Sequence, residues 1–199
     1  MNAREKILEA VVGLLGTEVG AGFTYDRLAR EAKVSRQTLY AHFPTRADLL
    51  VAVADHARAK LDADRLSLPI LEAATGVDAL AALLAFHVAF TPRVLREYRA
   101  VEFARSTDPE LMKAFGQRTR GRDQLIRLVM TRLEAEGRLQ PAWTVATATD
   151  FVTAVVSAST TYELLENRGW TPAELQERLL RVFTRSLLTP STEGGTHDR

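Results

Sequence analysis

The stretch FTYDRLAREAKVSRQTLYAHFPTRADLL, residues 23–50, predicts three helices separated by two very short breaks. Thr24 is a good N-cap for the first helix, because its hydroxyl can accept a backbone N–H that has no helical partner. Phe23 precedes the cap and Leu28 follows at the fourth helical position, and these are the two positions of a hydrophobic staple. Ser35 repeats the signal after a break of a few residues. Two short helices joined in this way are typical of a helix-turn-helix, whose second helix enters the major groove of DNA.

The second predicted helix starts after Ser35 and stops at Pro44. Leu39 and Phe43 are four residues apart and share a face with Val34, so we expect them to point into a small core. The remaining side chains of this helix are then left on the outer face: Arg36, Gln37, Thr38, Tyr40 and His42.

The outer face carries residue types that recognise DNA. Arginine can form two hydrogen bonds with guanine and glutamine can form two with adenine, so Arg36 and Gln37 are the predicted base-reading residues. Thr38, Tyr40 and His42 are of types that bind phosphate, although Tyr40 can equally belong to the small core. Arg46 opens the next helix after the N-cap Thr45, where its charge and the backbone N–H groups attract phosphate.

The run of residues 23–50 resembles the DNA-binding segment of the tetracycline-repressor (TetR) family of bacterial regulators. The matching positions are Thr24, Leu28, Ala32, Val34, Ser35, Thr38-Leu39-Tyr40, His42-Phe43 and Arg46. The close match covers about residues 5–55, and the remainder agrees in length, helix count and the type of its last helix. With Lys33 added, the predicted DNA-binding residues are Thr24, Lys33, Ser35, Arg36, Gln37, Thr38, Tyr40, His42 and Arg46.

The chain departs from the family pattern at two positions. The family usually has glycine in the turn, where this chain has Lys33. If that position is left-handed, a residue other than glycine costs about 1 kcal/mol, while Lys33 adds positive charge near the phosphates. The family often has a small residue or proline where this chain has Gln37, so a long amide at this position predicts a specificity of its own.

Helical periodicity continues through the rest of the chain, and no strand-like alternation interrupts it. We therefore expect an all-α protein of about nine helices. The predicted domains are a helix-turn-helix domain over 1–47, a helical effector-binding and dimerisation domain over 48–188, and a disordered tail over 189–199. We expect a connection bracketed by Pro69 and Gly76, an N-cap at Thr91-Pro92 and a helix start at Asp108-Pro109. Further helices are expected over about 119–136, 141–167 and 172–188.

Composition excludes several classes of site. The 199 residues include no cysteine, which excludes disulfides, thiolate zinc sites and a cysteine nucleophile and fits a cytoplasmic location. The N-terminus lacks the apolar core of a signal peptide, and no apolar run approaches the roughly 20 residues of a membrane span. The net charge is +1, but residues 33–46 contain three basic side chains and no acid. We expect no cofactor and no metal; His42 lacks neighbouring ligands for one.

The resemblance to the TetR family implies a partner and an effector. Members are homodimers in which the last two helices, here about 143–167 and 172–188, pack as a four-helix bundle. Two reading helices then meet the two half-sites of a palindromic operator. A small molecule binds within the larger domain and shifts the helix that starts at Thr45. The implied function is a repressor released from DNA by a small-molecule effector.

The candidate walls of a largely apolar effector pocket come from aromatic residues and from polar residues on otherwise apolar helices. They are Phe86, His87, Phe90, Tyr98, Phe103, Phe115, Met130, Asp150, Phe151, Ala154 and Ser157. Each of them can equally be an ordinary core residue. Buried polar groups such as His87 and Thr153 need a partner, which can be a ligand, a water or another side chain.

Two other functions stay open beside this one. His87, Asp150 and Ser157 are residue types used by hydrolases, but no nucleophile-elbow motif or phosphate loop accompanies them, so we do not expect an enzyme. A constitutive or architectural DNA-binding protein without an effector is the other alternative. A closed, mostly apolar cavity in the larger domain favours an effector, whereas a filled core favours the constitutive protein.

Overall fold

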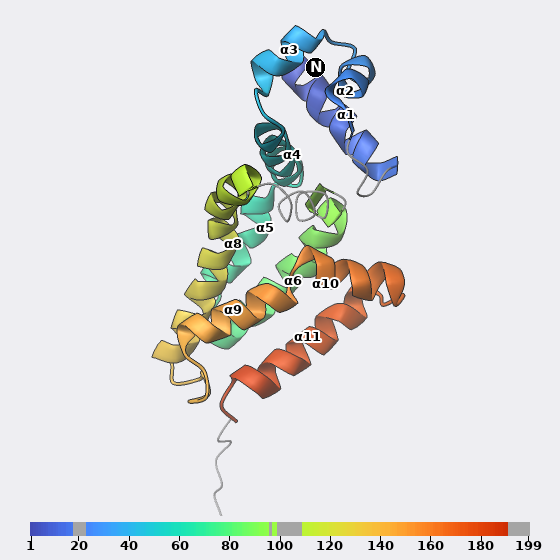
Figure 1. Cartoon of the computed structure of the whole chain (residues 1–199). Coiled ribbons are helices and arrows are strands. Elements are labelled where there is room, and N and C mark those ends of the chain that lie inside the picture. The colour runs from blue at the N-terminus through green and yellow to red at the C-terminus, as the bar shows by residue number, and fades with distance from the viewer. Residues whose placement is uncertain (18–22, 96, 99–108, 191–199) are drawn as a thin grey trace, which may run out of the picture. The chain divides into compact units, whose positions relative to one another are not determined.

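The computed structural model of the chain describes residues 1–17, 23–95, 97–98 and 109–190, and every regular element in these residues is a helix (Figure 1). The predicted all-α class is confirmed, with ten α-helices in the described part instead of the nine expected. They are α1 (Ala3–Thr17), α2 (Tyr25–Glu31), α3 (Arg36–His42), α4 (Arg46–Lys60), α5 (Ala63–Glu72), α6 (Gly76–Phe90), α8 (Pro109–Ala135), α9 (Val145–Val155), α10 (Ala158–Tyr162) and α11 (Pro172–Leu187). A short 3-10 helix, η1 (Thr91–Val94), and a π-helical turn, η2 (Glu163–Asn167), complete them.

The chain forms two compact units. Unit 1 comprises Met1–Leu66 with Phe90–Gly121, and unit 2 comprises Ser67–Ala89 with Arg122–Arg199. Helix α4 packs on α1 and so belongs with the first three helices, which means that the contact units do not follow the boundary expected after residue 47. The boundary after residue 47 was drawn between a DNA-binding and an effector-binding function, and it stays a prediction.

Unit 1 is built around α1, which packs against α2, α3 and α4. Its core takes Ile7, Leu8 and Val11 from α1 together with Leu28 from α2 and Leu39 from α3. All of these side chains are fully buried. Because α1 contacts both halves of the helix-turn-helix, it fixes the position of α3 within the unit.

Four of the predicted helix starts are confirmed in the structure. The hydroxyls of Thr24 and Ser35 accept the backbone N–H groups of Arg27 and Thr38, as N-caps do. Thr45 and Thr171 form complete capping boxes with the acids three residues on. Such caps involve only three or four neighbouring residues, which is why the sequence alone predicts them.

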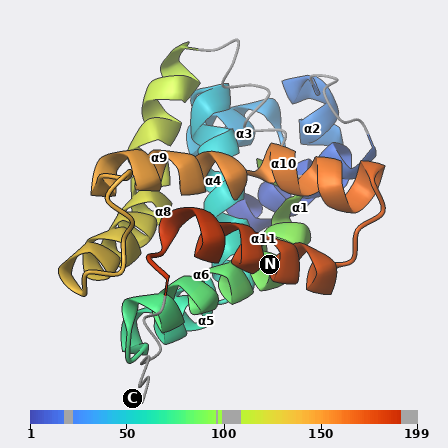
Figure 2. The ribbon, with the colours of Figure 1, turned by 90° about the horizontal axis from the view of Figure 1, so that it is seen from below.

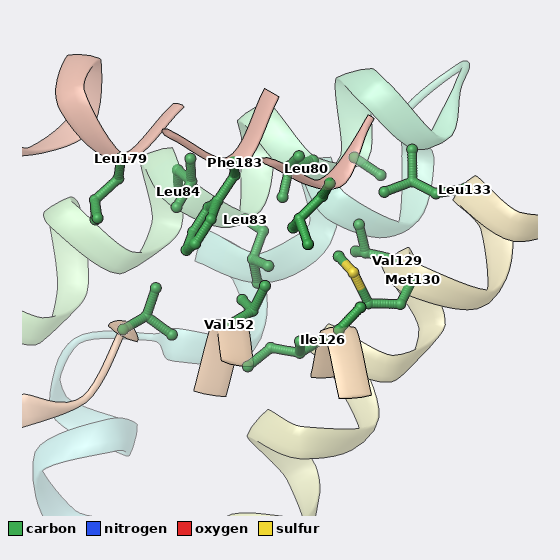
Figure 3. Packing of buried hydrophobic residues seen from close by; sticks show 14 of the residues in the cluster. Leu80, Leu83, Leu84, Ile126, Val129, Met130, Leu133, Val152, Leu179 and Phe183 are labelled. Carbon is green, nitrogen blue, oxygen red and sulfur yellow. The ribbon is translucent and has the colours of Figure 1, made fainter. Parts of the chain in front are cut away.

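Unit 2 encloses the larger core (Figure 3). Helices α6, α8, α9 and α11 all contribute, and the ring of Phe183 on α11 points toward Leu83 and Leu84 of α6. Ile126 and Met130 supply the α8 side of the same core and are fully buried. Helix α11 runs back beside α9 and α10 in both overall views (Figures 1 and 2).

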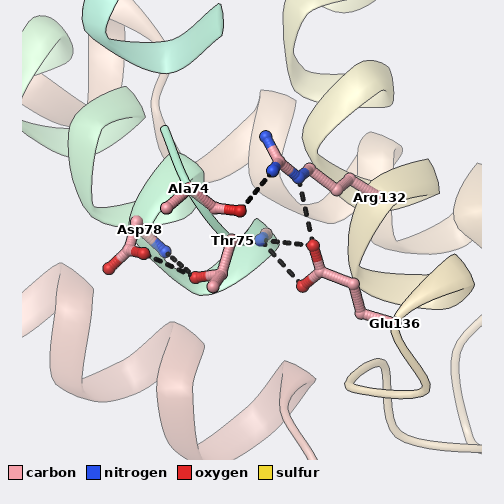
Figure 4. Close-up of polar contacts among 6 residues, drawn as sticks. Ala74, Thr75, Asp78, Arg132 and Glu136 are labelled. Carbon is pink, nitrogen blue, oxygen red and sulfur yellow. Dashed lines mark hydrogen bonds and ion pairs between the residues drawn. The ribbon is translucent and has the colours of Figure 1, made fainter. Parts of the chain in front are cut away.

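A polar clamp joins the start of α6 to the end of α8 (Figure 4). Both carboxylate oxygens of Glu136 accept the backbone N–H of Gly76, at 2.9 and 2.8 Å, and Arg132 donates to Glu136 and to the carbonyl oxygen of Ala74. A carboxylate at this end of a helix also favours the helix dipole. A Cβ at Gly76 would lie 2.9 Å from Cδ2 of Leu133, so a larger residue requires that side chain to shift.

The helix predicted over 141–167 is interrupted in the structure. Helix α9 ends at Val155, and Ser157 adopts an extended conformation and caps α10. Val155 and Val156 are β-branched and weaken the helix at this point, while the hydroxyl of Ser157 offers the new helix an N-cap. The expected continuous helix was wrong because this local competition outweighs the apolar periodicity.

A predicted break at Pro69 was wrong, and the predicted N-cap Thr91 lies one position further along. Pro69 lies inside α5, so the connection before α6 is only residues 73–75. A proline inside a helix costs about 3 kcal/mol, and we attribute its acceptance to the complete burial of Ile70 beside it. Thr91 is the first residue of η1 instead of its N-cap, because the chain continues from α6 directly into η1. The start expected at Asp108-Pro109 agrees with α8, although α8 then runs unbroken to Ala135.

One described segment, Gly76–Val94, has the length and mean hydropathy of a membrane-spanning helix. Half of it is buried inside the protein, and Leu80, Leu83 and Leu84 belong to the core of unit 2. The buried helix of a protein core passes the same test of length and composition, so the segment is weak evidence for a membrane span.

Candidate nucleic-acid interface

Helix α3 presents one buried and one exposed face. Leu39 and Phe43 are 0% and 2% exposed, as predicted, and they attach the helix to the core of unit 1. Thr38 is half-buried, and its hydroxyl lies 2.8 Å from that of Ser35. The other candidate side chains are exposed: Arg36, Gln37, Tyr40 and His42. The outer face of α3 therefore presents groups suited to base edges and phosphates.

Arg36 is held by two groups in the free protein. Its Nη1 lies 2.9 Å from Oδ1 of Asp26 on α2, and its guanidinium lies 5.9 Å from the ring centroid of Tyr40, one turn further along α3. A hydrogen bond with Tyr40 and the charge of Asp26 raise the pKa of Arg36 above its ordinary value. The side chain therefore stays cationic and has a defined direction.

Tyr40 rests on Tyr25, the first residue of α2. Their ring centroids are 4.9 Å apart, and the hydroxyl of Tyr25 donates to the carbonyl oxygen of Phe43 at 3.5 Å. Burial raises the pKa of Tyr25, with a smaller contribution from Tyr40. Tyr40 is thus both a surface residue and part of the contact between α2 and α3, and the two roles left open for it are compatible.

Lys33 occupies the turn between α2 and α3 with a φ of 54°, in the left-handed region. Its N–H donates to Arg30 at 3.2 Å, and the N–H of Val34 donates to Ala29 at 3.0 Å, so the turn closes the end of α2. The position is therefore left-handed, and Lys33 bears the steric cost expected for a residue other than glycine. The family's usual glycine adopts such a φ without this cost.

We expect Lys33→Gly to raise the free energy of unfolding of unit 1 by up to about 1 kcal/mol, since the strain of the left-handed residue is removed. The same substitution should weaken DNA binding and flatten its salt dependence, because one positive charge near the phosphates is lost. Thermal unfolding and salt titrations of DNA affinity measure the two effects. Lys33→Asn, which keeps a residue tolerant of this φ, is the matched control; a fall in stability with glycine would contradict this account of the turn.

Arg46 contacts the segment that precedes α2. Its guanidinium lies 4.9 Å from the ring centroid of Phe23, and Nη1 donates to the carbonyl oxygen of Phe23 at 3.4 Å. The side chain remains exposed. Arg46 therefore joins α4 to the beginning of the helix-turn-helix, a structural contact that the prediction of phosphate binding did not include.

The structure adds residues that sequence reasoning missed. Arg4, in the first turn of α1, lies with its guanidinium 5.6 Å from the ring centroid of Phe43, which places a cation beside the end of α3. Asp26, in the first turn of α2, pairs with Arg36. No local pattern could have found these contacts, because each joins residues on different helices.

Comparison with known proteins bears directly on this arrangement. Residues 7–53 match the family model of bacterial regulatory proteins, tetR family. The chain carries a tetR-family DNA-binding domain. The matched residues include all of α2 and α3 and the first half of α4, so the family domain contains every predicted DNA-binding residue.

Solved structures extend the likeness to the whole fold. A regulator from Saccharomonospora viridis in complex with choline matches with a TM-score of 0.74 at 16% identity, covering 94% of this chain and 98% of that one. A tetR-family regulator from Shewanella sp. PV-4 matches at 0.73 and 18% identity, covering 96% and 100%. NalD of Pseudomonas aeruginosa, the secondary repressor of an efflux pump, matches at 0.69 and 23% identity, covering 96% and 98%. No curated protein matches. The chain has the fold of tetR-family transcriptional regulators.

The candidate pocket residues of this chain are divided between the two units. Phe86, His87, Met130 and Phe151 contribute to unit 2, whereas Phe90 and Tyr98 belong to unit 1, with ring centroids 5.9 Å apart. Phe103 and the side chain of Phe115 lie outside the described residues.

Three of the candidate pocket residues lie on α9 or at the start of α10. Asp150 and Ala154 are exposed on the outer face of α9, because the inner face is the one that carries Ala148 and Val152. Ser157 is engaged as the N-cap of α10, with its hydroxyl donating to that of Thr160. The assignment of these three residues to a pocket stays a prediction.

His87 is the most deeply buried of the polar candidates, at 6% exposure. Its Nε2 lies 3.0 Å from the hydroxyl of Thr161, which itself donates to the carbonyl oxygen of Ser157 at 2.8 Å. The hydroxyl has only one proton, so it accepts from Nε2–H of His87. Burial and, to a smaller extent, the charge of Arg122 lower the pKa of His87 to about 4, and the ring is neutral near pH 7.

Thr153 differs from His87 in having an unsatisfied buried group. Its hydroxyl oxygen has no hydrogen-bond partner among the residues that the structure describes. Nε of Arg122 also lacks a hydrogen bond there, but it lies 3.6 Å from Oδ1 of Asp123 in an ion pair. An unpaired buried polar atom costs about 1–3 kcal/mol, and a bound molecule can supply the partner that the Thr153 hydroxyl lacks.

Proposed function

We propose that this tetR-family chain is a transcriptional repressor that binds a palindromic operator as a homodimer and is released by a small-molecule effector. The observation that carries the proposal is the outer face of α3, where Arg36 and Gln37 stand exposed on a helix anchored by fully buried Leu39. A rigid helix with base-reading side chains at its N-terminal end is what major-groove recognition requires.

In this proposal residues 1–47 bind DNA and residues 48–188 bind the effector and dimerise. The dimer forms through the helices of residues 143–167 and 172–188, that is α9, α10 and η2 together with α11. Exposed small side chains on α9, among them Ala146 and Ala154, allow a second helix to approach closely. Val182 on α11 is 49% exposed and offers apolar surface for the same interface. A two-fold interface uses the same surface on both subunits.

An effector is supported by two observations of different kind. The S. viridis regulator of the same fold is in complex with choline. In unit 2 of this chain, the buried hydroxyl of Thr153 has no hydrogen-bond partner among the described residues. We propose a largely apolar small molecule, bound without a cofactor and without catalysis, in a cytoplasmic regulator. The effector has to bind the DNA-free conformation more tightly, since coupling between two ligands is reciprocal.

We expect Arg36→Ala and Gln37→Ala each to cost about 1–3 kcal/mol of operator binding and to relax specificity at one base pair per half-site. The reason is the loss of hydrogen bonds to one base edge, while the phosphate contacts remain. The measurement is the affinity of each variant for the operator, for operators substituted at single base pairs and for a scrambled duplex.

Glu31→Gln, at an exposed residue at the end of α2, is the control for a general change of charge. If either variant of α3 keeps the ratio of operator to scrambled affinity unchanged, the readout by that residue is wrong.

A further inference from the structure

We propose that Asp26 is a positioning residue for DNA recognition, which holds the guanidinium of Arg36 and sharpens the choice of base that Arg36 reads. The inference rests on the proposed base readout by Arg36. Asp26 lies in the first turn of the supporting helix α2 and is not among the predicted DNA-binding residues.

The contact is direct and lies on the surface. Nη1 of Arg36 is 2.9 Å from Oδ1 of Asp26, and the two side chains are 60% and 59% exposed. Exposed ion pairs contribute about 0–1 kcal/mol to folding, so stability alone gives little reason for this one. The ion pair matters more for geometry, because the carboxylate of Asp26 holds Nη1 of the Arg36 guanidinium in one place at the start of α3.

A second contact fixes the same cation from another side. The guanidinium lies 5.9 Å from the ring centroid of Tyr40, and that ring rests on Tyr25 at 4.9 Å. Tyr25 and Asp26 are consecutive on α2, while Tyr40 and Arg36 lie one turn apart on α3. The first turn of α2 therefore holds two neighbouring side chains of the recognition helix in a single arrangement.

Holding Arg36 before DNA arrives changes the energetics of readout. A free arginine side chain loses up to about 2 kcal/mol of rotamer entropy when it is fixed, and pre-ordering moves part of this loss from binding to folding. A guanidinium has five N–H donors, so the pair with Asp26 leaves donors for a base. A cation fixed in this way is less able to turn toward a wrong base or a phosphate.

Asp26 has an opposing effect on affinity. A carboxylate beside α3 repels phosphate groups and lowers the affinity for every DNA sequence. The residue therefore lowers general affinity and raises discrimination. This combination separates it from a residue that only stabilises the fold, whose loss would weaken binding to all sequences.

The test is Asp26→Asn, which keeps size and shape and removes the charge, in the full chain. We expect affinity for a scrambled duplex to rise several-fold. The preference for the operator over an operator changed at the base pair read by Arg36 should fall by about tenfold, within the range of one base contact. Asp64→Asn, which breaks the exposed Arg58–Asp64 pair of 2.8 Å elsewhere in unit 1, is the matched control and should change neither quantity.

A double-mutant cycle completes the experiment. In the Arg36→Ala background, Asp26→Asn should leave discrimination unchanged, because Asp26 acts through Arg36. If Arg36→Ala relaxes discrimination and Asp26→Asn does not, the positioning role is wrong while the readout stands. Equal loss of discrimination from Asp26→Asn with and without Arg36 would also overturn it. If Arg36→Ala leaves discrimination intact, the proposed readout fails, and the inference built on it fails too.

Discussion

Leu39→Ala is expected to lower the free energy of unfolding of unit 1 by about 2–5 kcal/mol and to abolish specific DNA binding. Leu39 is 0% exposed and attaches the seven-residue α3 to the core around α1. Domains of this size are stable by only about 5–15 kcal/mol, so the substitution removes a large part of the margin. Without this contact α3 cannot present Arg36 and Gln37 in one orientation.

Thermal unfolding and DNA affinity measure the two consequences of Leu39→Ala. Leu128→Ala is the control, because this leucine is 45% exposed and its loss should change stability by no more than about 0.5 kcal/mol. A Leu39→Ala protein with unchanged unfolding and full operator affinity would show that α3 is not held by this core.

The second large effect is expected from Phe183→Ala, which should destabilise unit 2 by about 3–5 kcal/mol. The ring is fully buried, lies 5.9 Å from that of Phe151 and points toward Leu83 and Leu84 (Figure 3). Its removal leaves a cavity where α11 meets α6 and α9. In the proposed dimer, α11 also faces the second subunit, so the variant should dissociate at higher protein concentration than the wild type.

Calorimetry and sedimentation of Phe183→Ala test both statements. The exposed Leu71→Ala provides the comparison, since this side chain is 52% accessible. Equal unfolding temperatures for the two variants would contradict the place assigned to Phe183 in the core.

The parts of the fold that follow from local chemistry could be predicted from the sequence. Thr24, Ser35, Thr45 and Thr171 cap helices through hydrogen bonds to residues three positions on, and all four starts were predicted. Gly137 and Gly169 have positive φ at the predicted helix ends. The exposed and buried faces of α3 follow from helical spacing alone.

The errors occurred where tertiary packing or a local alternative decided the outcome. Pro69 predicts a break, but the helix continues and buries Ile70 completely. The apolar run through Val155 and Val156 predicts one helix, but Ser157 starts another. Whether a helix continues or breaks at Pro69 and Ser157 depends on the relative energies of the two conformations, which the sequence pattern does not give.

The candidate pocket residues depend even more on tertiary packing, which the sequence does not reveal. Periodicity indicates that α9 has an apolar face, but Asp150 and Ala154 turn out to lie on the exposed one. The partner of His87 is Thr161, 74 positions away in the sequence, and the partner of Arg36 is Asp26 on another helix. Such pairs depend on how helices pack, which spacing within one helix does not reveal.

Selection of DNA from a random pool by the full chain tests the central claim most directly. The account predicts enrichment of a two-fold symmetric sequence whose half-sites are separated by a whole number of helical turns, about 10 base pairs or a multiple. In the same selection, Arg36→Ala should lose the preference at one symmetric pair of positions only. Failure of the wild-type chain to enrich any palindrome, at low as well as moderate salt, would contradict the account.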